Sequence, residues 1–208
     1  MYGHIVLHPV SRRMNLRSGD AGMKLAPDLK SLLLDLAGMS TEAILQSARQ
    51  LYGELYLNRE KFGIHSTHDG HVLVFHADAF DHAFYTTSDR ICHPERKDII
   101  RAGSIERIRW IGYLVSGAVP GSACFEVPSP SGRYRPPNRL YVVFDTPYVV
   151  WLEPRKDTGW KFKSAYPLSI EDIRKYTRRG RTVWKYRENG PVIKPAHGAT
   201  SLVQGKKP

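Results

Sequence analysis

Two apolar segments joined by a proline-containing link constrain the fold more than any other part of the chain. Leu140–Phe144 and Tyr148–Leu152 are rich in β-branched and aromatic residues, and a three-residue link ending in Pro147 separates them. Proline cannot donate to a β ladder and presets φ, so it suits a turn and not a central strand. The pattern predicts two antiparallel strands joined by a tight connection.

A third strand is predicted directly after this pair. Trp160–Tyr166 alternates aromatic or hydroxyl-bearing side chains with Lys161, Lys163 and Ala165, as in a half-buried strand. The resulting meander, residues 138–166, has one aromatic and hydroxylic face and one cationic face. A surface of this kind could hold a phosphodiester.

Helices and further strands are predicted around the meander. Leucines spaced as one helical stripe predict a helix from Lys24 to Gly38, and Ser40 is a suitable N-cap for a second helix. Together they form a predicted helical hairpin. Other helices are expected at Ala79–Tyr85, Pro94–Ala102, from Ser104 to about Val115, and after Ser169, and other strands at His71–Phe75, Ala123–Val127 and Arg181–Arg187.

These elements predict an α+β chain in three parts. Residues 1–59 would be an N-terminal helical accessory region and residues 60–187 the α+β domain. Residues 188–208 are rich in glycine and proline, which is typical of a loose tail.

The positive charge of the chain is concentrated near its C-terminal end. The net charge is +11, and between Arg133 and Arg187 there are fourteen Lys and Arg residues against five Asp and Glu. Such a block attracts polyanions, because Lys and Arg displace counterions from phosphates. A merely basic soluble protein is the alternative. The basic arm around Arg133 and Arg135 is either a closure over bound nucleic acid or an ordinary solvated loop.

Several other classes of protein are disfavoured. The two cysteines form neither a disulfide framework nor a zinc motif, which favours the cytoplasm, and no apolar run is long enough to span a membrane. His65, His68 and His71 recur every third residue, but Asp69 and Gly70 favour a turn there, so no metal site is expected. No phosphate-binding, dinucleotide-binding or zinc-protease motif is present, and no cofactor is expected.

The remaining side chains suit metal-independent cleavage of RNA. The 2′-OH of the substrate is the nucleophile, so the protein has to supply a base, an acid and fixed positive charge. An imidazole near its normal pKa can serve as base or acid at neutral pH, and Arg and Lys neutralise charge that develops on phosphorus. His82 falls on a different side of its predicted helix from Phe80 and Phe84, so it can face a cleft or solvent. His76 lies at the preceding strand-to-helix corner; either histidine is alternatively a structural hydrogen-bonding residue.

The motifs FHADAFDHAF, IERIRWI, LYVVFDTPYVVWL and WKFKSAYP, in this order, resemble the barnase–EndoU–colicin–RelE superfamily of ribonucleases, especially its phage and mobile-element branches. The resemblance covers about residues 70–187. It implies helices packed on a twisted antiparallel sheet of about four strands, with the active site on the open sheet face and no metal. The residues that it implies are the helix histidine His82, a cation at Arg107 or Arg109, and the hydroxyls of Ser164 and Tyr166 beside Lys161 or Lys163. The meander differs from the superfamily pattern in showing no evident acidic general base.

Two functions follow as hypotheses. The first is an endoribonuclease, acting as a toxin or effector, with His82, Arg109, Ser164 and Tyr166 as catalytic residues. Its expected substrate-binding residues are His76, Arg107, Arg133, Arg135, Lys161 and Lys163. RNA is the expected partner, and an acidic inhibitor protein is compatible with the charge. The second is a non-catalytic nucleic-acid-binding module of a phage or mobile element, which would show salt-sensitive binding without cleavage.

Overall fold

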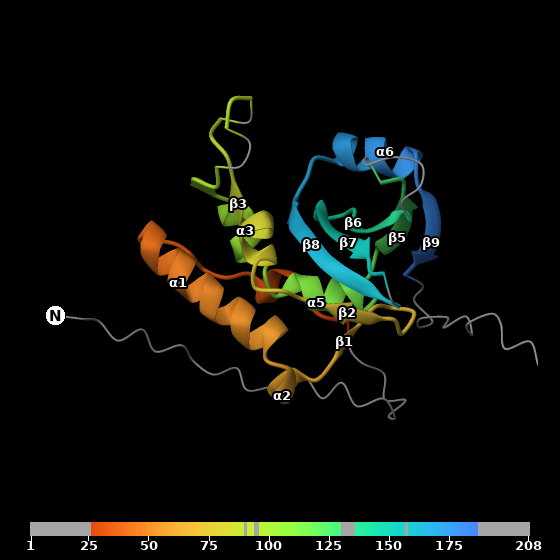
Figure 1. Cartoon of the computed structure of the whole chain (residues 1–208), viewed down its shortest axis with the longest axis horizontal. Coiled ribbons are helices and arrows are strands. Elements are labelled where there is room, and N and C mark those ends of the chain that lie inside the picture. The colour runs from red at the N-terminus through yellow and green to blue at the C-terminus, as the bar shows by residue number, and fades with distance from the viewer. Residues whose placement is uncertain (1–25, 90, 94–95, 130–135, 157, 187–208) are drawn as a thin grey trace, which may run out of the picture.

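A curled sheet of seven strands forms the centre of the molecule (Figure 1). The computed structural model describes residues 26–89, 91–93, 96–129, 136–156 and 158–186. The strand order is β1-β2-β8-β7-β6-β5-β9. The bounds are β1 (His65–Ser66), β2 (Val72–Val74), β5 (Ser122–Val127), β6 (Asn138–Val143), β7 (Tyr148–Pro154), β8 (Trp160–Pro167) and β9 (Arg181–Lys185). The α+β class is therefore confirmed, but the expected number of four strands is wrong.

The centre of the sheet is the predicted meander. β6 pairs with β7, and β7 with β8, both antiparallel. Trp151 on β7 opposes Ser164 on β8, and the next residue of β7, Leu152, opposes Phe162. This irregularity leaves Lys163 as an extra residue in β8. β2 joins the other edge of β8 in the parallel direction, and β9 pairs with β5.

Helices cover the two faces of the sheet unequally. The larger hydrophobic core lies between one face and the helices α1 (Thr41–Tyr52), α3 (Ala79–Phe84) and α5 (Trp110–Val115), and it contains Tyr52, Phe80, Phe84, Trp110, Tyr148 and Phe162. On the other face, α6 (Ile170–Arg178) packs through Ile173 against residues that include Val142 and Val149 (Figure 1). The sheet is thus covered on both sides, and the face that carries α6 is not fully open.

The N-terminal helical hairpin is only half present. α1 begins after Ser40, whose hydroxyl accepts a hydrogen bond from the main-chain NH of Ala43, as its capping position predicts. The expected helix from Lys24 to Gly38 is reduced to a single 3-10 turn, η1 (Lys30–Leu32), among residues 26–38. After this turn, Leu34 and Leu36 are half-buried between exposed neighbours, which is the two-residue period of an extended chain.

The chain between α1 and α3 forms short elements at one edge of the sheet. α1 continues into a π-helical turn, η2 (Gly53–Leu57), and a four-residue helix, α2 (Arg59–Phe62), precedes β1. The helix α1 lies in the same hydrophobic core as α3, since Ile44, Ala48 and Tyr52 belong to it.

The predicted helix at Pro94–Ala102 is wrong where the chain is described. Ile99–Ile100 forms strand β4, which pairs antiparallel with β3 (Tyr85–Thr86), and the NH of Arg101 donates to the carbonyl of Phe84. The Asp98 carboxylate accepts hydrogen bonds from the main-chain NH and the hydroxyl of Ser88, on the loop side of the paired strands. A short helix, α4 (Ala102–Glu106), follows. Cross-strand bonding has outweighed local helix propensity.

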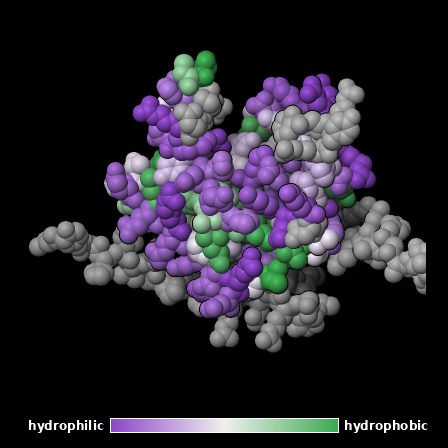
Figure 2. All heavy atoms as spheres, viewed as in Figure 1, coloured by the Kyte–Doolittle hydropathy of each residue, from purple (hydrophilic) through white to green (hydrophobic). Residues whose placement is uncertain are grey.

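The surface in the view of Figure 2 is mainly hydrophilic, with apolar residues in small separate groups. Within the described residues, no helix has both the length and the apolar character needed to cross a bilayer.

Candidate functional site along strand β8

Helix α3 lies against β8, and a hydrogen bond joins two of the predicted site residues. The hydroxyl of Ser164 on β8 donates to the main-chain carbonyl of His82, at 3.4 Å. Phe80, Ala83 and Phe84 of α3 are buried, so His82 is on the exposed side of the helix. His82 and Ser164 are therefore neighbours, but Ser164 is buried and its hydroxyl holds the helix in place. Ser164 is therefore better placed to hold α3 in position than to contact a substrate.

Tyr166 belongs to a cluster of aromatic side chains with one arginine. Its hydroxyl accepts a hydrogen bond from Nε1 of Trp151, at 3.0 Å, and the guanidinium of Arg101 lies over its ring, 5.1 Å from the centroid. Trp151 contacts Tyr176 of α6 edge-on, with 5.2 Å between ring centroids. We call Trp151, Tyr166, Tyr176 and Arg101 the aromatic–arginine cluster. Each of the four is partly or fully exposed.

The two lysines of β8 are placed along the same strand. Lys163 forms an ion pair with Glu153 of β7, and both side chains are close to half exposed. Lys161 opposes Glu153 in the register of the two strands. Glu153 is thus an acidic group in the meander, beside the lysines, and it partly compensates their charge.

Arg107 and Arg109 flank the junction between α4 and α5. The guanidinium of Arg107 donates to the carbonyl of Gly103 and to Glu106, and it lies over the ring of Trp110. Gly103 is packed against Pro167, the last residue of β8, because a Cβ built at Gly103 would be 3.2 Å from its ring. Arg107 is therefore held near the end of β8, while Arg109 immediately precedes α5 and is half-buried.

The remaining predicted residues are not part of this arrangement. His76 is exposed before α3, and its main-chain carbonyl accepts a hydrogen bond from Tyr52. Arg133 and Arg135 lie outside the described residues. Of the aromatic–arginine cluster, only Tyr166 was predicted as a site residue. Trp151, Tyr176 and Arg101 were missed, and no motif singles out Arg101.

A second polar network lies at the turn between β1 and β2 and was also missed. The Asp69 carboxylate accepts two hydrogen bonds from Arg139 of β6, at 2.8 and 2.6 Å, and one from the hydroxyl of Thr67. Nδ1 of His68 is 2.7 Å from the hydroxyl of Tyr141. Arg139 is buried, and its guanidinium lies over the ring of Trp160, 4.3 Å from the centroid. We call Asp69, Arg139, His68 and Tyr141 the turn network.

The protonation states of the turn network favour a structural role. Burial lowers the pKa of His68 to about 4, so this imidazole is neutral at pH 7. Burial would raise the pKa of Asp69, but the hydrogen bonds from Arg139 and Thr67 outweigh it and lower the pKa well below the usual range. Burial raises the pKa of Tyr141 well above its usual value. None of these three groups titrates near pH 7, where a general acid or base has to exchange its proton. One residue in the sequence could have indicated this network: Arg139 lies within an apolar strand. An arginine buried there needs an acidic partner.

The three histidines at positions 65, 68 and 71 do not converge. His65 packs against Phe75, His68 bonds to Tyr141, and His71 lies 3.7 Å from the Asp69 carboxylate. Among the residues described, no group of three or more His, Cys, Asp or Glu side chains could hold a metal ion.

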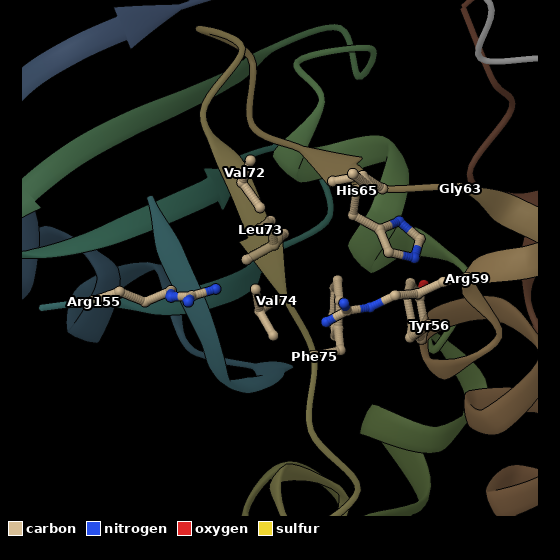
Figure 3. Close-up of a pocket in the computed structure, with 10 residues that line it drawn as sticks. Tyr56, Arg59, Gly63, His65, Val72, Leu73, Val74, Phe75 and Arg155 are labelled. Atoms are coloured by element: carbon tan, nitrogen blue, oxygen red, sulfur yellow. The ribbon is translucent and has the colours of Figure 1, made fainter. Parts of the chain in front are cut away.

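A pocket of about 190 Å³ lies at the sheet edge formed by β1 and β2 (Figure 3). Of the predicted ribonuclease residues that the structure describes, none lines it, although Lys161 of β8 pairs with Val74 in its wall.

Comparison of the chain with known proteins finds no matching family model, no similar curated protein and no similar solved structure.

Proposed function

We propose that the protein is a metal-independent endoribonuclease whose site lies along β8, between α3 and the aromatic–arginine cluster. The observation that supports this most is the position of His82. It is an exposed imidazole on a helix that is bonded to β8. Tyr166 belongs to the same strand, and the guanidinium of Arg101 lies over its ring. Cleavage through the substrate's 2′-OH requires an acid or base and fixed positive charge, which an imidazole and the arginine and lysine side chains of this region can supply.

The proposed reaction is a transesterification. His82 makes one of the two proton transfers and water makes the other: one takes the proton of the 2′-OH, and one gives a proton to the leaving 5′-oxygen. The 2′-oxygen forms a bond to phosphorus while the bond from phosphorus to the 5′-oxygen breaks. Arg101 and Lys163 neutralise charge on the phosphate, with Arg107 near the end of the strand. Tyr166 is oriented by Trp151, and Ser164 positions α3. The products are a 2′,3′-cyclic phosphate and a free 5′-hydroxyl.

The proposal is tested by incubating the purified protein with RNA in the presence of EDTA. Cleavage that leaves a cyclic phosphate is expected, and His82→Ala should lower the rate by about 10²-fold or more. The matched control is His71→Ala, which removes another exposed histidine at the β1–β2 turn and should leave the rate unchanged. Wild-type activity in His82→Ala removes this residue from the mechanism, and absence of cleavage by the wild-type protein on diverse RNAs refutes the proposal.

The role of Ser164 is tested separately. Ser164→Ala removes the hydrogen bond to α3, so the rate should fall without a change in the pH dependence of the rate. Since His82 carries the proton transfer in this scheme, only substitution of His82 should change the pH profile. A shifted profile in Ser164→Ala would instead place its hydroxyl in the proton transfer.

Non-catalytic binding of nucleic acid is the second candidate, and the aromatic–arginine cluster favours it. Aromatic rings beside arginine are a common platform for stacking of unpaired bases. This function predicts binding that weakens as salt rises, without cleavage, and equal affinity of wild type and His82→Ala. If cleavage occurs, the growth of cells that express the wild-type protein is compared with the growth of cells that express His82→Ala, which tests whether the protein acts as a toxin. A toxin of this charge would be expected to have an acidic inhibitor protein as a partner.

A further inference from the structure

The C-terminal half of α6 carries a group of exposed cations. Arg174, Lys175, Arg178 and Arg179 are exposed, and they occupy four of the six positions from 174 to 179. Arg181 follows at the start of β9, with 75% of its side chain exposed. We call these five residues the α6 ridge. In Figure 2, the side chains over α6, at the upper right, are strongly hydrophilic.

Acidic side chains compensate only two of these five cations. Lys175 pairs with Asp172, one turn earlier on the helix, at 2.8 Å, and Arg181 pairs with Glu126 of β5. The other three members of the ridge form no ion pair with any residue that the structure describes. The ridge therefore presents net positive charge to the solvent.

The helix does not need this much charge for its own stability. A helix dipole places only about half a negative elementary charge at the C-terminal end, so one cation there is enough to offset it. Arg174 and Arg178 are four residues apart and share one side of the helix, where like charges destabilise each other. Cations gathered along one helix in this way are the electrostatic footprint of a surface that binds a polyanion.

The ridge is held rigidly on the sheet. Ile173 is fully buried, and the hydroxyl of Ser169 caps α6 by accepting a hydrogen bond from the main-chain NH of Asp172. The turn into β9 lies directly on β5, because a Cβ built at Gly180 would be 3.1 Å from the carbonyl oxygen of Glu126. A ligand would therefore meet a surface whose backbone is already ordered, which lowers the entropic cost of binding.

Tyr176 connects the ridge to the aromatic–arginine cluster. It lies between ridge residues in the sequence of α6, is 41% exposed, and contacts Trp151 edge-on. Unpaired bases stack on aromatic rings, and phosphates bind Arg and Lys, so rings bordered by cations match both parts of a single nucleic-acid strand. An acidic protein would use the charge of this surface but not its rings, so the arrangement favours a nucleic acid.

We infer that the α6 ridge binds the phosphate backbone of an unpaired RNA strand whose bases lie on the aromatic–arginine cluster. The choice of RNA as the nucleic acid rests on the proposed function, whereas the placement of the strand rests on the ridge and on Tyr176. The substrate then extends beyond the scissile phosphate by several nucleotides along α6. Arg174, Arg178 and Arg179 are the phosphate contacts.

Binding is measured by fluorescence anisotropy with the full chain and a labelled, unstructured RNA of about 12 nucleotides, which is within the usual range of single-strand sites. Every 2′-oxygen of this probe is methylated, so the proposed reaction cannot cleave it. Arg178→Gln combined with Arg179→Gln should weaken binding by about tenfold. It should also make the slope of log affinity against log salt shallower by about 1.4, since each phosphate contact on a single strand contributes about 0.7.

Two further variants complete the experiment. The matched control is Arg59→Gln combined with Lys61→Gln, which removes the same charge from exposed positions on α2, at the opposite side of the molecule from α6 (Figure 1). It should change neither the affinity by more than about twofold nor the salt slope. Tyr176→Leu should weaken binding by about fivefold or more without changing the slope, because it removes stacking and not charge.

Four results would overturn the inference: no saturable binding of the probe, an effect of the ridge variant no larger than that of the control, an unchanged affinity in Tyr176→Leu, or displacement of the RNA by poly-glutamate at equal charge concentration. The last result would assign the surface to an acidic protein. The outcome is distinguishable from that of the ribonuclease test. Binding that depends on the ridge, without cleavage of unmodified RNA, refutes only the ribonuclease, and cleavage together with binding that does not depend on the ridge refutes only this inference.

Discussion

Substitution of Asp69 by Asn should destabilise the protein strongly, because it leaves the buried guanidinium of Arg139 without its counter-ion. The side chain of Arg139 is 8% exposed and that of Asp69 is 28% exposed, so the pair is largely shielded from water. Removing one partner of a buried ion pair typically costs 3–5 kcal/mol, and the amide oxygen of Asn keeps one acceptor. We expect Asp69→Asn to lower the free energy of unfolding by about 2–3 kcal/mol, which for a chain of this size lowers Tm by about 4–12 °C.

Urea unfolding of the full chain measures this change, and Glu126→Gln is the matched control. Glu126 pairs with Arg181, but 75% of that arginine side chain is exposed, so this substitution should cost at most about 1 kcal/mol. Combining Asp69→Asn with Arg139→Met should cost less than the sum of the two single changes, since the second removes the unpaired charge. The reasoning is refuted if Asp69→Asn costs no more than Glu126→Gln, or if the two changes are additive.

Three further predictions concern stability. Because the pKa of His68 is lowered to about 4 in the folded protein from about 6.5 in an unfolded chain, stability is fully present above pH 6.5 and is lost as pH falls toward 4. At this half-buried position the loss should be on the order of 1–2 kcal/mol, and urea unfolding at several pH values should show a flatter profile for His68→Gln. Gly159→Ala should cost about 2 kcal/mol or more by thermal unfolding, since φ at this residue is +103° and a Cβ would collide with the Val72 carbonyl oxygen; an unchanged Tm would contradict this. Tyr56→Phe should cost about 1–2 kcal/mol in urea, because it leaves the Ile108 carbonyl without its donor, and a neutral result would show that water replaces the hydroxyl.

The sequence predicted the middle of the sheet well, because its signals there are local. The apolar runs on either side of Pro147 became β6 and β7, and the alternating segment after them became β8. The short helix that carries His82 was also predicted, from Asp78 and the phenylalanines at positions 80 and 84.

The failures have a different physical origin. The leucines at positions 29, 32, 33 and 36 have the spacing of one face of a helix. In the folded protein, however, Leu34 and Leu36 pack against the core with the two-residue spacing of an extended chain. The edges of the sheet depend on pairing between distant segments, such as β2 with β8, which periodicity does not encode. The burial of Ser164 could not be predicted because the packing of α3 on β8 determines it.

The parallel pairing of β2 with β8 has a consequence for how the protein is made. Leu73 of β2 pairs with Trp160 of β8, and β9 pairs with β5. Pairing at both sides of the sheet therefore cannot be completed until these late segments of the chain have been synthesised. On the ribosome, β2 emerges long before β8, and β5 before β9, although each has one partner nearby in the chain, β1 or β6. Loop closure over such separations slows folding, and unpaired strand edges meanwhile invite aggregation. Recombinant production should accordingly gain from slow translation at low temperature or from chaperones that shield exposed edges.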